Sequence, residues 1–178
     1  MQSFRYTQDT IDAELKKSKE DFILHFRSAY TDDYPPAWMI AEILPLGLLC
    51  RIYTNLKDNV IKKRVAQHFG LQVPVFSSWI VIQAGLRNMC CHHCRTWNRE
   101  LATITTEPRR TKYGWIDSSR TDKRRMYYRI CMIRYFLYTV SPNNSFKDKL
   151  KTLLAAYPNI DTAAMGFPSD WESEDIWK

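Results

Sequence analysis

Apolar side chains recur at helical spacing along almost the whole chain, and no run of residues alternates between polar and apolar as a half-buried strand does. Residues 10–30 show the pattern first, with Ile11, Leu15, Phe22 and Phe26 on one side of an expected amphipathic helix. Such a helix is stable only when another element covers its apolar side. The pattern therefore predicts an all-α fold, a helical bundle.

Prolines and glycines divide the remainder of the chain into further expected helices. Pro45 and Gly47 interrupt one apolar stretch, Asp58 or Asn59 is placed to cap the next helix, and Gly70 is placed to end it. The further helices are expected at residues 34–43, 48–56, 58–70, about 74–101, 121–140 and 144–158.

The length of 178 residues and a hydrophobic content of 45% suit one domain with its own core. We expect a single helical domain over residues 1–178, in which the expected 74–101 and 121–140 helices pack together. Its core should extend over about residues 20–158. Residues 159–178 should form a short tail, with Trp171 and Trp177 as packing anchors.

The sequence also bears on the compartment. No apolar signal segment is visible near the start, and the longest apolar run, residues 37–50, is interrupted by Glu42 and Pro45 and is too short to span a bilayer. Five cysteines, three of them within residues 90–94, do not resemble a secreted disulfide framework. These features predict a cytoplasmic protein without a membrane partner.

Positive charge is concentrated in one third of the chain. The formal net charge is +7, and residues 87–134 hold 12 Lys and Arg against 4 Asp and Glu. Aromatic side chains are interleaved with these basic residues, a combination that favours a polyanionic partner, with nucleic acid first. The alternative is a solvated basic face without a partner.

Within this basic third, residues 103–120 contain Pro, Gly, Ser and Thr without a helical period and are expected to form a loop. The next helix should start with Thr121 or Asp122 as its cap. Tyr113 and Trp115 in the loop could stack on the bases of a single strand, but we expect them to anchor the loop to the core.

The segment LRNMCCHHCRTWNRE, residues 86–100, lies in the expected 74–101 helix. It combines two histidines, three cysteines and three arginines, which are residue types found in catalytic and metal sites. On a helix one side of this segment would be polar and basic, and the opposite side would be buried. The polar side consists of Asn88, His92, Arg95 and Arg99. The side expected to be buried consists of Leu86, Met89, Cys90, His93 and Trp97.

A histidine beside arginines on an open surface suits phosphodiester chemistry. Imidazole can transfer protons near neutral pH, and guanidinium groups can hold phosphate oxygens and offset developing charge. Metal is unnecessary for such cleavage of RNA, because the ribose 2′-hydroxyl can supply the nucleophile. His92 is therefore the candidate for proton transfer.

A metal site in residues 90–94 is the weaker interpretation. All five residues are of ligand types, but consecutive residues on a helix point about 100° apart and cannot converge on one tetrahedral ion. A cysteine nucleophile is weaker still. We expect no metal and no cofactor, with the cysteines and His93 packed in the helix and His25 and His68 at the surface.

Arg87, Asn88 and His92 resemble the spaced arginine, polar residue and histidine signature of HEPN ribonucleases, and RNMCCHHCRTWNR resembles a sequence block of bacterial Abi-like (abortive infection, AbiD/AbiF type) proteins. Further blocks are similar and come in the same order as in that family, from about residue 20 to 177. These blocks are PPAWMIAEILPLGLLCRIYTNLK, VAQHFGL, SWI and YPNIDTAAMGFPSDW.

The resemblance implies a HEPN-like helical core and a metal-independent endoribonuclease that leaves 2′,3′-cyclic phosphate ends in phage-infected cells. It implies that His92 transfers the proton, Arg87 holds the scissile phosphate and Asn88 orients one of them. The chain carries a single motif, so a homodimer is implied. On a straight helix Arg87 and His92 lie about 140° apart, which a bend or a second copy must reconcile.

Two other functions stay open. One is a non-catalytic RNA-binding module whose partner is RNA, such as a structured small noncoding RNA, bound by the same basic surface. The other is a purely structural helical protein with a solvent-facing basic stripe. The residues expected to bind RNA are Arg95, Arg99, Arg109, Arg110, Arg124 and Arg125.

Overall fold

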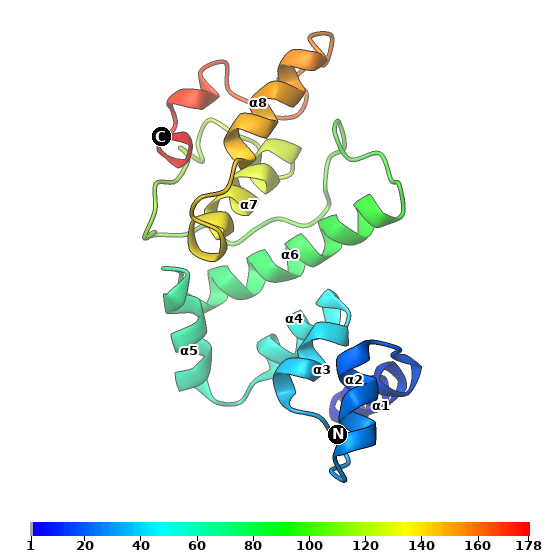
Figure 1. Cartoon of the computed structure of the whole chain (residues 1–178). Helices are drawn as coiled ribbons and strands as arrows, with labels where there is room; N and C mark the ends of the chain where they lie inside the picture. The colour runs from blue at the N-terminus through cyan, green and yellow to red at the C-terminus, as the bar shows by residue number, and fades with distance from the viewer. Residues whose placement is uncertain (1) are drawn as a thin grey trace. The chain divides into compact units, whose positions relative to one another are not determined.

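The computed structural model describes residues 2–178, with side chains from Tyr6 onward. Over this range the chain is all-helical, without a strand, which confirms the predicted fold class (Figure 1). The helices are α1 Gln2–Lys17, α2 Asp21–Ala29, α3 Ala37–Ile43, α4 Leu46–Asn55, α5 Asn59–His68, α6 Val73–Cys91, α7 Met126–Val140 and α8 Phe146–Ala156, followed by the 3-10 helices η1 Trp171–Ser173 and η2 Asp175–Trp177.

The chain divides into two compact units, the first ending at Asn55 and the second beginning at Leu56. The first unit contains α1 to α4, and the second contains α5 to α8 and the two 3-10 helices. Each unit is described by itself. The expectation of one domain over residues 1–178 stays a prediction.

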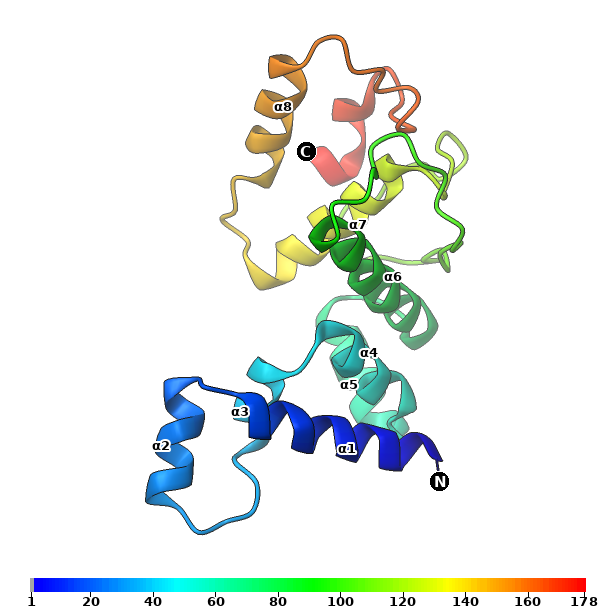
Figure 2. The ribbon, with the colours of Figure 1, turned by 90° about the vertical axis from the view of Figure 1, so that its right-hand side faces the viewer.

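In the first unit, the single helix expected over residues 10–30 is two helices, so that prediction was wrong. Helix α1 ends at Lys17 and α2 begins at Asp21, and Figure 2 shows them as separate rods joined by a turn. The Ser18 hydroxyl accepts a hydrogen bond from the Glu20 backbone N–H at 3.3 Å, which favours a turn over a continued helix. Glu20 then has an extended backbone (φ −63°, ψ 134°) ahead of α2.

The predicted interruption at Pro45 is confirmed. Helix α3 ends at Ile43 and α4 begins at Leu46. The intervening Leu44 is extended (φ −78°, ψ 142°), the conformation that a following proline imposes on its neighbour.

In the second unit, α5 has the boundaries that its sequence predicts. The Asp58 side chain accepts hydrogen bonds from the backbone N–H groups of Val60 (2.7 Å) and Ile61 (3.2 Å) and caps the helix. After the helix, Gly70 adopts a left-handed conformation (φ +66°). An added Cβ at Gly70 would collide with the Lys112 side chain, so only glycine fits this position.

The core of the second unit lies between α6 and α7, which are in contact as predicted. Trp79 of α6 is fully buried, and its ring lies 4.7 Å from the Trp115 ring and 5.4 Å from the Tyr135 ring, measured between centroids. Tyr113 stacks on Tyr138 of α7 at 5.1 Å. Both loop aromatics therefore anchor the loop to the core, as expected.

The tail is also anchored by its aromatic residues. Trp177 is fully buried, and its indole N–H donates to the Tyr127 hydroxyl at 3.1 Å. Trp171 packs edge-on against it, with ring centroids 5.0 Å apart. Both predicted packing anchors are confirmed.

Helix α7 begins later than expected, because the residues predicted to cap it form other contacts. The Asp122 carboxylate accepts the Arg124 backbone N–H at 2.8 Å, and the Asp122 carbonyl accepts the Arg125 N–H at 3.0 Å, which closes a turn. Thr121 is buried and donates its hydroxyl to the Gly166 carbonyl at 3.4 Å. The helix starts only at Met126.

Candidate functional site

The candidate site lies where α6 ends, and this end comes about ten residues earlier than predicted. Helix α6 stops at Cys91, and His93 adopts a left-handed conformation (φ 53°). The Cys94 N–H donates to the Met89 carbonyl at 2.9 Å and the His93 N–H donates to the Cys90 carbonyl at 3.1 Å. These two bonds form a Schellman motif, which satisfies carbonyls at the helix end.

The expected polar stripe therefore spans two kinds of structure. Asn88 lies in the last turn of α6 and His92 is the C-cap residue, whereas Arg95 and Arg99 belong to the irregular segment that leads toward α7 (Figure 1). All four residues are exposed. The prediction of one continuous helical stripe was wrong beyond the C-cap.

The opposite side of the segment is only partly buried. Leu86 is buried and Met89 is half-buried, but Cys90, His93 and Trp97 are exposed, with the whole Trp97 residue 40% accessible. The expectation that these three residues pack in the core was wrong, because the helix ends before the stripe is complete.

The same helix end exposes the cysteine cluster. Cys90, Cys91 and Cys94 are free and exposed, contrary to expectation, while Cys50 and Cys131 are free and buried. Burial raises the pKa of both buried thiols. Among the described residues, no three His, Cys, Asp or Glu side chains lie together as a metal-ligand set. His25 and His68 are exposed, as expected.

Arg87 and Asn88 are the two predicted catalytic residues that contact each other. The Arg87 guanidinium donates from Nη1 to the Asn88 side-chain oxygen at 3.1 Å, and both residues are exposed. Within the described residues no hydrogen bond joins Arg87 to His92. The last turn of α6 thus holds the arginine and its amide partner, and His92 follows at the cap.

The chain matches the family model of Abi-like proteins over residues 2–98. The chain belongs to the Abi-like protein family. The matched region ends after His92, so it contains all of α1 to α6 and the candidate site at the end of α6. Comparison with curated proteins and with solved structures gave no match. Membership suggests a function in abortive infection.

A membrane-spanning helix is not found in the described part of this Abi-like protein. Within residues 2–178 no single helix is long and apolar enough to cross a bilayer, although α5 and α6, bent by 70° at their junction, meet the length and composition criteria as a pair.

The arginines predicted to hold phosphate or bind RNA in this Abi-like protein divide into two groups. Arg124 is paired with Glu100 at 2.7 Å, and Arg125 lies 3.8 Å from Asp122. In the first group, therefore, carboxylates of the same chain already offset the positive charge. The second group is exposed, and no carboxylate of the described residues lies within ion-pair distance of it: Arg87, Arg95, Arg99, Arg109 and Arg110.

Arg129 of α7 is a buried cation that the sequence-based interpretation did not identify. It is 1% exposed, and its guanidinium donates to the Thr103 carbonyl, with no carboxylate of the described chain in ion-pair range. Its own carbonyl accepts the Gln83 side-chain amide at 3.2 Å. Burial lowers the pKa of Arg129. The feature of the sequence that could have identified this buried cation is the presence of an arginine among the mainly apolar residues 126–140.

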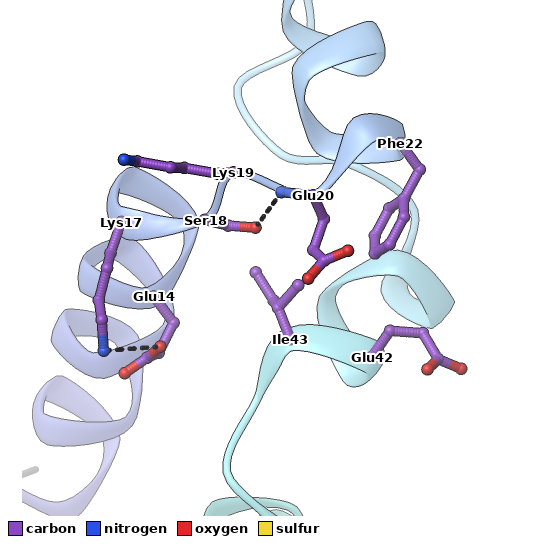
Figure 3. Close-up of a pocket in the computed structure, with 8 residues that line it drawn as sticks. All are labelled: Glu14, Lys17, Ser18, Lys19, Glu20, Phe22, Glu42 and Ile43. Carbon is purple, nitrogen blue, oxygen red and sulfur yellow. Dashed lines mark hydrogen bonds and ion pairs between the residues drawn. The ribbon is translucent and has the colours of Figure 1, made fainter.

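Arg129 and Arg99 line a hollow of about 330 Å³ beside α6. A second hollow, of about 430 Å³, lies in the first unit and is lined by charged side chains of α1, α3 and the α1–α2 turn (Figure 3). In it Lys17 lies 3.9 Å from Glu14. No predicted site residue lines this second hollow.

The left-handed conformation of His93 leads to a stability prediction. A side chain in this conformation costs about 1–2 kcal/mol, whereas glycine avoids the strain but loses more entropy on folding. His93→Gly should therefore stabilise the protein by about 0.5–1 kcal/mol, measured by urea unfolding. Gly70→Ala, at the left-handed end of α5, should have the opposite sign. Destabilisation by His93→Gly would contradict the assigned helix end.

Proposed function

We propose that this Abi-like protein is a metal-independent endoribonuclease acting on RNA in the cytoplasm during abortive infection. The observation that carries the proposal is the end of α6, where exposed Arg87 and Asn88 contact each other and exposed His92 follows at the cap. This places a cationic donor and a proton-transfer group five residues apart at the end of the same helix.

The residues support a transesterification. In it the ribose 2′-hydroxyl gives its proton to a base and attacks the adjacent phosphorus, while the 5′-oxygen leaves and takes a proton from an acid. The products are a 2′,3′-cyclic phosphate and a 5′-hydroxyl. His92 would transfer protons, and Arg87, oriented by Asn88, would offset the charge on the phosphoryl oxygens. The reaction needs no metal and no other cofactor.

A homodimer fits this chemistry better than a monomer. The reaction requires a base and an acid, but one α6 end offers only His92 in the predicted catalytic position. Two copies related by a twofold axis would supply two imidazoles and two guanidinium groups around one phosphate. We therefore propose that the ends of two α6 helices face each other.

The RNA path would be formed by the exposed arginines that have no carboxylate partner. The helix end itself carries a partial negative charge, which disfavours phosphate. Arginine side chains must therefore supply the attraction to the RNA backbone. Arg95 and Arg99 would continue the path away from Arg87, and Arg109 and Arg110 would extend it.

Charge reversal should separate the two groups of arginines. The double variant Arg109→Glu/Arg110→Glu should weaken RNA binding and reduce the slope of log affinity against log salt by about 1.5, since each phosphate contact contributes roughly 0.7–0.9. Arg124→Glu/Arg125→Glu should change the slope less, because Glu100 and Asp122 already offset these charges. Filter binding at several salt concentrations measures both, and an unchanged slope in the first variant would refute the RNA path.

The deciding experiment for the proposed function is incubation of the protein with a pool of single-stranded and structured RNAs in EDTA. Cleavage that persists in EDTA is the expected result. Cleavage that stops in EDTA would contradict a metal-independent reaction. Tight, salt-dependent binding without cleavage would favour the alternative, a non-catalytic module that binds a structured small RNA.

A further inference from the structure

The hollow of about 330 Å³ beside α6 is built from two kinds of surface. Its size is at the lower end of the range for small-molecule sites, roughly 300–1,000 Å³. Arg99 and Arg129 add two positive charges to it. The other lining residues are mainly apolar: Val81, Ile82, Gly85, Leu86, Met89, Leu101, Ala102 and Thr103.

The buried position of Arg129 indicates an electron-rich ligand. A guanidinium away from water is costly unless an anion or several acceptors face it. Arg129 has one carbonyl acceptor, from Thr103, and a weak sulfur contact to Met132 at 3.8 Å, and its Nε has no hydrogen-bond partner among the described residues. An anionic ligand in the adjoining hollow would offset this charge.

Gly85 leaves the wall of the hollow open. A Cβ built on Gly85 meets no atom within 4 Å, so the absent side chain leaves free space rather than a close backbone contact. Glycine inside a helix costs about 0.5–1 kcal/mol relative to alanine. Gly85 therefore lowers the stability of α6. A larger side chain at this position would collide with no atom of the protein, but it would occupy part of the hollow that Gly85 lines.

The hollow adjoins the candidate catalytic residues. Met89, which lines it, lies in α6 directly after Asn88 and three residues before the C-cap residue His92. Arg99, which also lines it, is one of the exposed arginines without a carboxylate partner. A chain of nucleotides at the end of α6 would reach the hollow without leaving the basic surface.

We propose that this hollow is a nucleotide subsite, in which the apolar walls hold a base and Arg99 and Arg129 attract the phosphate of the same nucleotide. The proposal rests on the proposed function, because it places the nucleotide next to the scissile phosphate. Aliphatic and thioether side chains pack on the faces of a base, and a guanidinium can stack on the base as well as pair with phosphate. The ligand class is a nucleoside monophosphate unit, either free or within RNA.

Calorimetric titration of the protein, residues 1–178, tests the subsite, with AMP, GMP, CMP and UMP as separate ligands and with inorganic phosphate as a competitor. Gly85→Leu should reduce affinity for the preferred monophosphate at least tenfold by filling the hollow. Gly47→Leu is the matched control, because Gly47 also lies in a helix with no atom within 4 Å of an added Cβ and is outside the hollow. It should bind the monophosphate like the wild type.

Arg99→Gln provides a second test that is independent of the helix. Arg99 is exposed, so the substitution should not disturb folding. It should weaken binding of the monophosphate about tenfold and leave the weaker binding of the corresponding nucleoside unchanged. Equal affinity of Gly85→Leu and Gly47→Leu for the monophosphate would overturn the subsite. Inorganic phosphate that competes as well as the nucleotide would also overturn it, because the apolar walls would then contribute nothing.

An RNA arm separates this inference from the proposed function. If RNA cleavage depends on His92 but Gly85→Leu cleaves with an unchanged KM and binds monophosphates normally, the subsite is wrong and the nuclease stands. If no RNA is cleaved but Gly85→Leu abolishes monophosphate binding, the nuclease is wrong and the hollow stands as a site for free nucleotides. Loss of both RNA affinity and monophosphate affinity in Gly85→Leu is the expected result.

Discussion

Replacing His92 with alanine should reduce RNA cleavage by about 10²–10⁴-fold, the usual contribution of a general acid or base. RNA affinity should change little, because the exposed arginines that attract the backbone are intact. Among the described residues, the His92 side chain makes no hydrogen bond that holds the helix end, where the backbone N–H of His92 donates to the Asn88 carbonyl at 3.0 Å. Cleavage rates at saturating RNA and equilibrium binding are the two measurements.

His93→Gly is the matched control for this prediction. It removes the neighbouring exposed imidazole while retaining the left-handed backbone of the Schellman motif. Cleavage by this variant should remain close to that of the wild type. If both variants lose activity equally, or if His92→Ala keeps full activity, His92 is not the proton-transfer residue.

Replacing Trp177 with alanine should destabilise the protein by about 3–5 kcal/mol, the usual cost for a fully buried aromatic side chain. The substitution removes packing against Trp171 and leaves the buried Tyr127 hydroxyl without the indole N–H that it accepts at 3.1 Å. Urea unfolding followed by far-UV circular dichroism measures the change.

Trp97→Ala makes the same substitution in the same unit at a residue that is 40% exposed. It should cost less than about 1 kcal/mol, because most surface substitutions have small effects. A Trp177→Ala variant as stable as Trp97→Ala would show that the tail does not pack on α7 as described.

Most of the fold could be predicted, because the residues that cap, interrupt or end helices stand in the sequence where the helices of the structure begin and end. Pro45 separates two helices, the Asp58 carboxylate caps α5, and Gly70 ends it in a left-handed conformation. Trp177 could be assigned to the core because a large aromatic residue in a polar tail is seldom left in water. In each case one residue type has a strong and specific physical preference.

The boundaries that could not be predicted have no such residue. Helix α6 ends with His93 in the position where glycine is usual, so the sequence carries no terminating signal at Cys91. In the turn between α1 and α2, the Ser18 hydroxyl accepts the Glu20 N–H and the Arg27 guanidinium donates to the Leu15 carbonyl, but both residue types are also compatible with a helix. A helical period continued through both positions in the sequence, and the backbone did not follow it.

In the candidate site, too, some features could be predicted from the sequence and others could not. Arg87, Asn88 and His92 were predicted as a group from residue type, and the structure places them in the last turn and cap of α6, all exposed. The partners of Arg124 and Arg125 could not be predicted, since they depend on which carboxylates the fold brings near. Arg129 was missed because its burial results from the packing of residues 99–103 on α7, which spacing along the sequence does not describe.

The most direct test of the proposed reaction is the chemistry of the RNA ends. Wild-type protein is incubated with a defined RNA in EDTA, and the fragments are analysed by mass spectrometry. Attack by the 2′-hydroxyl leaves a 2′,3′-cyclic phosphate on one fragment and a 5′-hydroxyl on the other, which is the predicted result. Fragments with 5′-phosphate and 3′-hydroxyl ends would show that water is the nucleophile and would contradict the role proposed for His92 and Arg87.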